Sequence, residues 1–339
     1  MQLFHFCILF GTTVCDLSLE WNKLKHDYKK QHASDDEESD RKQIFIDNFI
    51  RIQNYQQIHS DASLTMRVKD LTDERVHEIV SDKKSSFKSY PMSSKQSIDV
   101  KNLPESLDWR VKGVISPVKR LGIIGEDVSA IVSTELVESL FAIERKQLIE
   151  GSVSRILDCC PQPIDTFECI QNMSGICKNS DYPSVLHKCE PNRCKPFATF
   201  DTIKRLTNND ENTMLAWIQK STLWAKMDAS GEEFSEYKGG IYDNDGCSEI
   251  MVAHVLQIVG YGVEGGKPFW ICKNNWGDHW GENGYIRIAR GKNMCGIATN
   301  VVQIDYTTTS NASRQQIIIP TIFITLLLTV IRQMIIAYY

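Results

Sequence analysis

The feature that most constrains the fold is a set of short segments rich in β-branched and aromatic residues in the last third of the chain. Gly-rich turns separate them, which is typical of neighbouring β-strands. These segments cover residues 223–227, 255–259, 269–273 and 284–289. An earlier segment, 129–148, is predicted to be a core helix from its apolar positions, which include Ile131, Leu136, Leu140 and Phe141. The sequence therefore predicts an α+β fold, with a helical half followed by a β-rich half.

Composition narrows the class of protein. The chain has 339 residues, of which 42% are hydrophobic and 24% charged. This length and balance are enough for one or two domains with a sizeable core, and they exclude intrinsic disorder and collagen-like structure. With 38 basic against 43 acidic residues the net charge is −5. No basic excess favours nucleic acid, so we expect no nucleic-acid partner.

The first 15 residues predict a signal peptide. An apolar run from Leu3 to Phe10 is followed by small residues, and the cleavage site is expected near Cys15. A short buried strand is the alternative. The chain has eleven cysteines, and removal of residues 1–15 leaves nine, so at least one thiol is expected to be free. This cysteine usage favours the secretory pathway, with an extracellular, lysosomal or vesicular, or surface-anchored destination.

The C-terminal tail, residues 307–339, contains an apolar segment. Residues 317–331 carry no charge, and Arg332 then precedes a second apolar stretch that ends at Tyr339. Residues 317–339 together would reach across a bilayer if Arg332 extended to the interface. A glycolipid-anchor signal is a second interpretation, because small residues 310–313 precede the tail. A buried terminal helix is the third, and a membrane partner is expected under the first two.

Residues 16–102 form a separate region without cysteine. Two helical patterns surround the acidic run 35–40, and a linker rich in Ser and Lys covers 83–101. The apolar positions of the two patterns are Trp21, Leu24 and Tyr28, then Phe45, Phe49 and Ile52. We expect a small helical module.

The most specific motif lies in the β-rich half. His254 stands in the run AHVLQIVGYG, and FWICKNNWGDHWGENGYIRIARGKNMCGIAT follows about twenty residues later. A histidine beside an apolar strand is more often a core residue than a catalyst. The order and spacing of His254, Asn274 and Trp276, however, resemble papain-family cysteine proteases, and the cathepsin L branch in particular. The resemblance implies that Asn274 orients the imidazole and that Trp276 shields it. It also implies a papain-like two-domain fold over 103–306, with a helical left domain and a β-barrel-like right domain.

The resemblance extends to the N-terminal part. Residues 103–119, LPESLDWRVKGVISPVK, are similar to the start of a mature cathepsin. An interspersed motif of cathepsin L-like zymogens is matched by Glu37, Arg41, Phe45, Asn48 and Ile52, with Gln56 where the last Asn is expected. The resemblance therefore implies that residues 16–102 are a helical inhibitory propeptide, which is the chain's own partner.

The chain departs from the family where the nucleophile is expected. Aligned without a gap from Trp109, Asp127 stands at the catalytic Cys and Leu121 at the oxyanion Gln. An aspartate at a helix N-terminus stays ionised, and it could form an ion pair with protonated His254, but it lacks the nucleophilicity of a thiolate. We therefore expect a pseudoprotease that binds a peptide or protein ligand. The alternatives are an active endopeptidase with an atypical nucleophile and a structural secreted or surface protein.

Residues expected to bind ligand are altered too. Where the family has Gly-Gly beside the cleft, this chain has Gln171 and Asn172, whose side chains would obstruct an extended peptide. Asn172-Met173-Ser174 and Asn311-Ala312-Ser313 are glycosylation sequons. A glycan at Asn172 is expected to crowd the cleft further.

The cysteines follow the family in part. The resemblance implies disulfides Cys247–Cys295 and Cys159–Cys189, while Ile124 replaces the usual partner of Cys169. This leaves Cys160, Cys177 and Cys194 as candidates to pair with Cys169. A zinc site is the competing interpretation, but no His stands at ligand spacing, so we expect no metal and no cofactor. Cys272 is expected to be a buried free thiol.

Overall fold

The computed structural model describes residues 17–58, 65–66, 100–120, 128–160, 164–250 and 254–307. The predicted signal peptide, most of the predicted linker, and the predicted anchor segment lie outside these residues. So do Leu121 and Asp127. Among the described residues, no helix is long and apolar enough to cross a membrane.

The N-terminal module consists of a helix over residues 17–27 and α2 (Asp35–Ile58). The two pack through the buried side chains of Trp21, Leu24 and Phe45. The acidic run 35–40, which the sequence placed between two helices, instead begins α2. Carboxylates in a first helical turn are favoured by the positive end of the helix dipole, which explains this difference. A short strand, β1 (Thr65–Met66), follows.

The helical half contains α4 (Val128–Arg145), α5 (Val153–Cys159) and α6 (Thr166–Asn172). Helix α4 confirms the predicted core helix, and nearly every residue from Val128 to Ala142 is buried, because α4 packs between the sheet and the other two helices. Ser152 and Asp165 accept hydrogen bonds from backbone N–H groups in the first turns of α5 and α6. These caps fix where the two helices begin.

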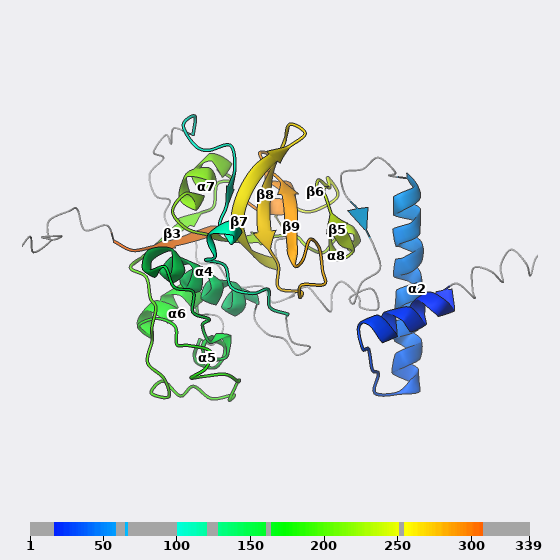
Figure 1. Cartoon of the computed structure of the whole chain (residues 1–339), viewed down its shortest axis with the longest axis horizontal. Coiled ribbons are helices and arrows are strands. Elements are labelled where there is room, and N and C mark those ends of the chain that lie inside the picture. Colours follow the sequence, from blue (N-terminus) through cyan, green and yellow to red (C-terminus); the bar gives the residue numbers. More distant parts are fainter. Residues whose placement is uncertain are drawn as a thin grey trace, which may run out of the picture. The chain divides into compact units, whose positions relative to one another are not determined.

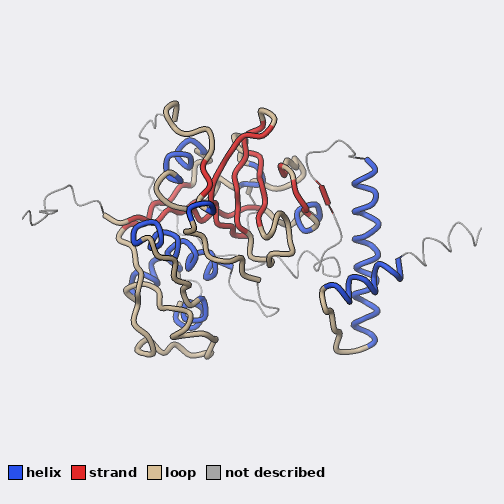
Figure 2. Tube along the Cα trace, in the orientation of Figure 1, coloured by secondary structure: helices blue, strands red, loops and turns tan. Residues whose placement is uncertain are grey.

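The β-rich half is an eight-stranded sheet in the order β3-β10-β4-β7-β8-β9-β6, with β2 pairing on β7. Figures 1 and 2 show β7, β8 and β9 side by side at its centre. The strands are β2 (Leu107–Asp108), β3 (Thr202–Leu206), β4 (Leu223–Met227), β6 (Ile241–Tyr242), β7 (His254–Glu264), β8 (Lys267–Lys273), β9 (Tyr285–Ala289) and β10 (Val301–Asp305). All four strands expected from the sequence are present.

Shorter elements connect these strands. They are the helices η1 (Arg110–Lys112), α7 (Glu211–Ile218), α8 (Glu232–Ser235) and η2 (Met294–Gly296), and the strand β5 (Tyr237–Gly239). Strand β5 pairs with β1 of the N-terminal module rather than with the large sheet. The module therefore contributes a strand to the β-rich half.

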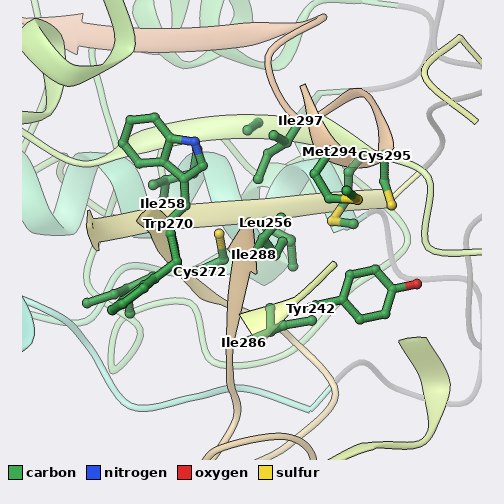
Figure 3. Packing of buried hydrophobic residues seen from close by; sticks show 14 of the residues in the cluster. Tyr242, Leu256, Ile258, Trp270, Cys272, Ile286, Ile288, Met294, Cys295 and Ile297 are labelled. Carbon is green, nitrogen blue, oxygen red and sulfur yellow. The ribbon is translucent and has the colours of Figure 1, made fainter. Parts of the chain in front are cut away.

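One apolar cluster fills the β-rich half. It takes in Leu256 and Ile258 of β7, Trp270 and Cys272 of β8, and Ile286 of β9, all of which are fully buried. Figure 3 shows these side chains packed together around β7 and β8. This core holds the first residue of β7 and the residues after β8 in fixed positions.

Candidate functional site

His254 is the first residue of β7, and it pairs with Met227, the last residue of β4. The histidine is 0% exposed. Strands β4 and β8 flank β7 on either side. The sheet thus holds the imidazole at one end of a strand that has a neighbouring strand on each side.

Asn274 immediately follows β8 and holds the histidine ring. The His254 Nε2 atom lies 2.8 Å from Asn274 Oδ1, and the backbone N–H of Asn275 donates to the same oxygen at 2.9 Å. An oxygen that receives a backbone N–H is an acceptor, so His254 must donate from Nε2. The neutral ring therefore presents a lone pair at Nδ1.

Aromatic side chains surround His254. The ring of Trp276 lies 5.0 Å from the imidazole, between centroids, and the ring of Phe234 lies 6.0 Å away. Phe234 also meets Trp276 edge to face at 5.3 Å. Burial lowers the pKa of His254 to about 4, while the hydrogen bond to Asn274 acts in the opposite direction. His254 is therefore neutral at pH 7.

The Nδ1 atom of His254 is buried and has no hydrogen-bond partner among the described residues. The chain reaches the site from residues 117–120, where Gly277 donates to the Lys119 carbonyl at 3.1 Å and Arg120 forms a β-bridge with Trp276. The next described residue is Val128, where α4 begins. Both flanks of the segment aligned with the nucleophile are thus fixed, and the roles assigned to Leu121 and Asp127 stay predictions.

Gln171 and Asn172 are not brought to His254. They end α6, and the Gln171 amide donates to the carbonyl of Asp201 at 3.0 Å. Asp201 in turn donates to the carbonyl of Asp305, at the end of β10. Strand β10 runs antiparallel to β4 and carries Asp305 away from Met227, the partner of His254. The structure therefore places these two residues at the opposite end of the sheet from the histidine.

Two features of the site were missed from the sequence. Phe234 comes from the short helix α8, and no local pattern marks it as a neighbour of His254. The second feature is a buried ion pair, in which Lys273 Nζ lies 2.7 Å from Glu135 of α4. Lys273 directly precedes Asn274, so this pair links α4 to the end of β8. Glutamates inside an apolar helical segment are the signal that could have revealed it.

Glu138 is a further buried carboxyl on α4. It accepts the backbone N–H of Gly151 at 2.6 Å. Burial raises the pKa of Glu138, and the charge of Lys119 opposes that shift. The helix behind the candidate site thus carries two carboxyls with different partners.

No accessible thiol lies near the histidine among the described residues. Both disulfides implied by the family resemblance are present, and Cys169 pairs with Cys160, which resolves an open question. The four disulfides are Cys159–Cys189, Cys160–Cys169, Cys177–Cys194 and Cys247–Cys295. Cys272 is free and buried on β8 (Figure 3), and burial raises the pKa of its thiol. Within the described ranges, no group of three or more His, Cys, Asp or Glu side chains is arranged to hold a metal ion.

Comparison with known families matches residues 103–304 to a model described as papain family cysteine protease. Among curated proteins, pro-cathepsin H of Mus musculus is 32% identical over 294 residues, which cover 80% of this chain and 86% of that protein. Ananain of Ananas comosus is 30% identical over 291 residues, which cover 80% of this chain and 83% of ananain.

Solved structures of precursors match over a longer range. A recombinant stem bromelain precursor superposes with a TM-score of 0.77 at 27% identity, covering 86% of this chain and all of that one. Digestive procathepsin L 3 of Tenebrio molitor gives a TM-score of 0.72 at 26% identity, covering 85% of this chain and 99% of its own. Both matches extend beyond the part matched by the family model. The N-terminal helical module therefore corresponds to a propeptide.

Proposed function

Because the chain belongs to the papain family of cysteine proteases, we propose that it has kept the zymogen architecture of that family and lost the ability to cleave peptide bonds. The observation that carries this proposal is the state of the cysteines. Of the nine that follow residue 15, eight form disulfides and the ninth, Cys272, is buried with a raised pKa. A nucleophilic cysteine must be an accessible thiolate, and none of the nine meets this requirement.

The residue aligned with the nucleophile supports the same conclusion. Asp127 would have to attack a peptide carbonyl to form a mixed anhydride, a poor intermediate for amide hydrolysis. Loss of the nucleophile in a serine protease costs on the order of 10⁶-fold in rate, and loss of one oxyanion donor roughly 10²–10³-fold. With Leu121 at the oxyanion position, both groups are replaced.

The state of His254 is consistent with this loss. The ring is neutral at pH 7 and offers a lone pair at Nδ1, which suits a general base. A general base accelerates attack only when its partner has a proton to give and becomes nucleophilic on losing it. An ionised Asp127 has no such proton. Asn274 and Trp276 thus hold and shield a histidine that has no thiol to deprotonate.

We assign the chain a binding or regulatory role, in which the retained two-domain scaffold holds a peptide or protein ligand. The internal precedent is the propeptide, whose β1 pairs with β5 and whose Tyr28 lies 5.6 Å from His279, between ring centroids. The surface formed by β5 and His279 is thus already used for binding a segment of the same chain.

The same proposal includes the secretory pathway as the location. The predicted leader at residues 1–15 and the apolar tail 317–339 favour export and membrane anchoring. Four disulfides support an oxidising compartment, since such bonds are rare in the cytosol. Protease protection of the tail in isolated microsomes tests the anchor.

The decisive experiment is a peptidase assay on the full chain after limited proteolysis in the 83–101 linker. Wild type is compared with Asp127→Cys and with the double variant Asp127→Cys, Leu121→Gln. We expect no hydrolysis by wild type. We expect hydrolysis by the double variant that a thiol-alkylating reagent abolishes.

His254→Ala in wild type and in the double variant is the matched control. Hydrolysis by wild type that disappears with His254→Ala and resists alkylation would overturn the proposal and favour an endopeptidase in which His254 and Asp127 activate water. Cys272→Ala should change none of these results, because the thiol is buried away from the histidine.

A further inference from the structure

We propose that Asn172 carries an N-linked oligosaccharide, and that this glycan covers the end of the sheet remote from His254. The segment Asn172-Met173-Ser174 satisfies the acceptor sequence Asn-X-Ser/Thr, with X other than Pro. The structure adds the geometry that the sequence could not supply. Asn172 and Ser174 are both exposed.

The local backbone presents Asn172 outward. Helix α6 ends at this residue, Met173 caps it, and Ser174 adopts a positive φ of 61°. Gly175 follows with φ 116°, where a side chain would collide with the carbonyl of Ala198. The chain therefore turns sharply into the body of the protein after Ser174. The side chains before the turn remain at the surface.

The neighbouring side chains leave the Asn172 carboxamide available. Gln171 uses its amide to bind the Asp201 carbonyl, whereas the Asn172 amide makes no hydrogen bond to another described residue. An attached sugar would therefore displace no interaction that holds α6 in place. Since glycans are bulky and strongly hydrated, such a site must be at the surface and free of structural duties.

The modification requires a lipid-diphosphate-linked oligosaccharide as donor. The bond between C1 of the first sugar and the phosphate oxygen breaks, and a bond forms between that C1 and Nδ2 of Asn172. Nδ2 loses one proton, and the lipid diphosphate leaves. The reaction involves no oxidation or reduction. It takes place in the compartment where disulfides form, and Cys169 and Cys177, which flank the sequon, are both disulfide-bonded.

The strand register separates this site from the histidine. Ser221 donates to the carbonyl of Ile304, next to Asp305, whereas His254 pairs with Met227, six residues further along the same segment. At ~3.3 Å per extended residue, Ser221 and Met227 lie roughly 20 Å apart along this segment. The glycan thus leaves the histidine end of the sheet open, in contrast to the crowding expected from the sequence.

The test is expression of the full chain in a eukaryotic secretory host, followed by peptide:N-glycosidase treatment in ¹⁸O-water and mass spectrometry. Conversion of Asn172 to labelled Asp identifies the site. Asn172→Gln and Ser174→Asn each remove the sequon, and the latter keeps a residue that tolerates positive φ. Met173→Ala keeps the sequon and serves as the matched control. All variants also carry Asn311→Gln, so that the tail sequon adds no glycan.

We expect loss of one glycan mass in both sequon variants and full retention in Met173→Ala. Three results would contradict the proposal. A chain that enters microsomes but carries no sugar at Asn172 contradicts the glycan and leaves the secretory location standing. A chain that remains in the cytosol contradicts both the glycan and the secretory location.

A binding measurement tests the placement of the glycan. We expect the Asp127→Cys, Leu121→Gln variant to bind a peptide aldehyde equally well in its glycosylated form and after enzymatic deglycosylation. Impaired binding by the glycosylated form contradicts the remote placement.

Discussion

The two halves of the papain-family domain hold their shape in different ways. The β-rich half packs one large apolar cluster behind β7, β8 and β9, and it contains a single disulfide, Cys247–Cys295. The helical half has three disulfides between residues 159 and 194, and its small cluster around Tyr182 contains two of those cysteines. It also buries Glu135 and Glu138 on α4.

The two halves therefore position the candidate site by different means. The large apolar core of the β-rich half fixes His254 and Asn274 through strand pairing and packing. The helical half adds three disulfides and the Lys273–Glu135 ion pair to the packing of α4. His254 and Asn274 therefore owe their positions to the β-rich half, whereas α4 belongs to the helical half.

The largest effect is expected where the two halves are joined. Lys273→Met leaves Glu135 as an unpaired charge in a site where the two side chains are 0% and 2% exposed. We expect a loss of about 3–5 kcal/mol in the free energy of unfolding. Urea denaturation measures it.

The matched control is the double variant Lys273→Met, Glu135→Leu, which should recover most of that loss because no charge is left buried. A single variant as stable as wild type would show that the halves are joined by packing rather than by charge.

The next effect tests the covalent links. Replacing Cys177 and Cys194 with Ser opens a loop of 17 residues, which chain-entropy arguments value at about 3 kcal/mol. We expect amide hydrogen exchange to accelerate in α5, α6 and the loop to residue 195, while β7 and β8 stay protected. Equal acceleration in both halves would mean that they unfold as one unit and are not stabilised separately.

A smaller effect concerns pH and His254. Its pKa is about 4 in the folded state, below the unfolded value of about 6.5. The unfolded chain therefore binds the proton first, and the stability that the neutral ring contributes is present above pH 6.5 and is lost as the pH falls toward 4. Between pH 7 and pH 5 we expect His254 to account for about 2 kcal/mol of lost stability. The carboxyls also titrate, so the measured quantity is the difference in pH dependence between wild type and His254→Gln. Identical profiles would contradict the depressed pKa.

The smallest effect is expected at Cys272. Cys272→Ala removes one sulfur atom from the apolar core and should cost about 1 kcal/mol. In wild type, a thiol reagent should label this residue only as the protein unfolds. Rapid labelling of the native protein would show that the core of the β-rich half opens readily, and it would reopen the question of a reactive thiol.

Much of the fold was predictable from the sequence because it depends on local patterns. The strand at 223–227 was predicted with both ends correct. The segments 255–259 and 269–273 lie within the longer strands β7 and β8, and β9 is one residue shorter than the predicted segment 284–289. Helix α4 begins one residue before the predicted start and ends three residues before the predicted end. The acidic run at 35–40 was misplaced because its charges favour a helix start as well as a linker.

Sequence alone thus determined which side chains are available, a histidine, an asparagine and a tryptophan at the family's spacing, and it predicts Asp127 at the position of the thiol. Tertiary structure decided how that chemistry is arranged. It paired Cys160 with Cys169, packed Phe234 against His254, and directed Gln171 to Asp201. These outcomes depend on residues far apart in the chain, whose proximity no local pattern encodes. The pKa of His254 has the same origin, because desolvation is a property of the surrounding fold and not of the residue.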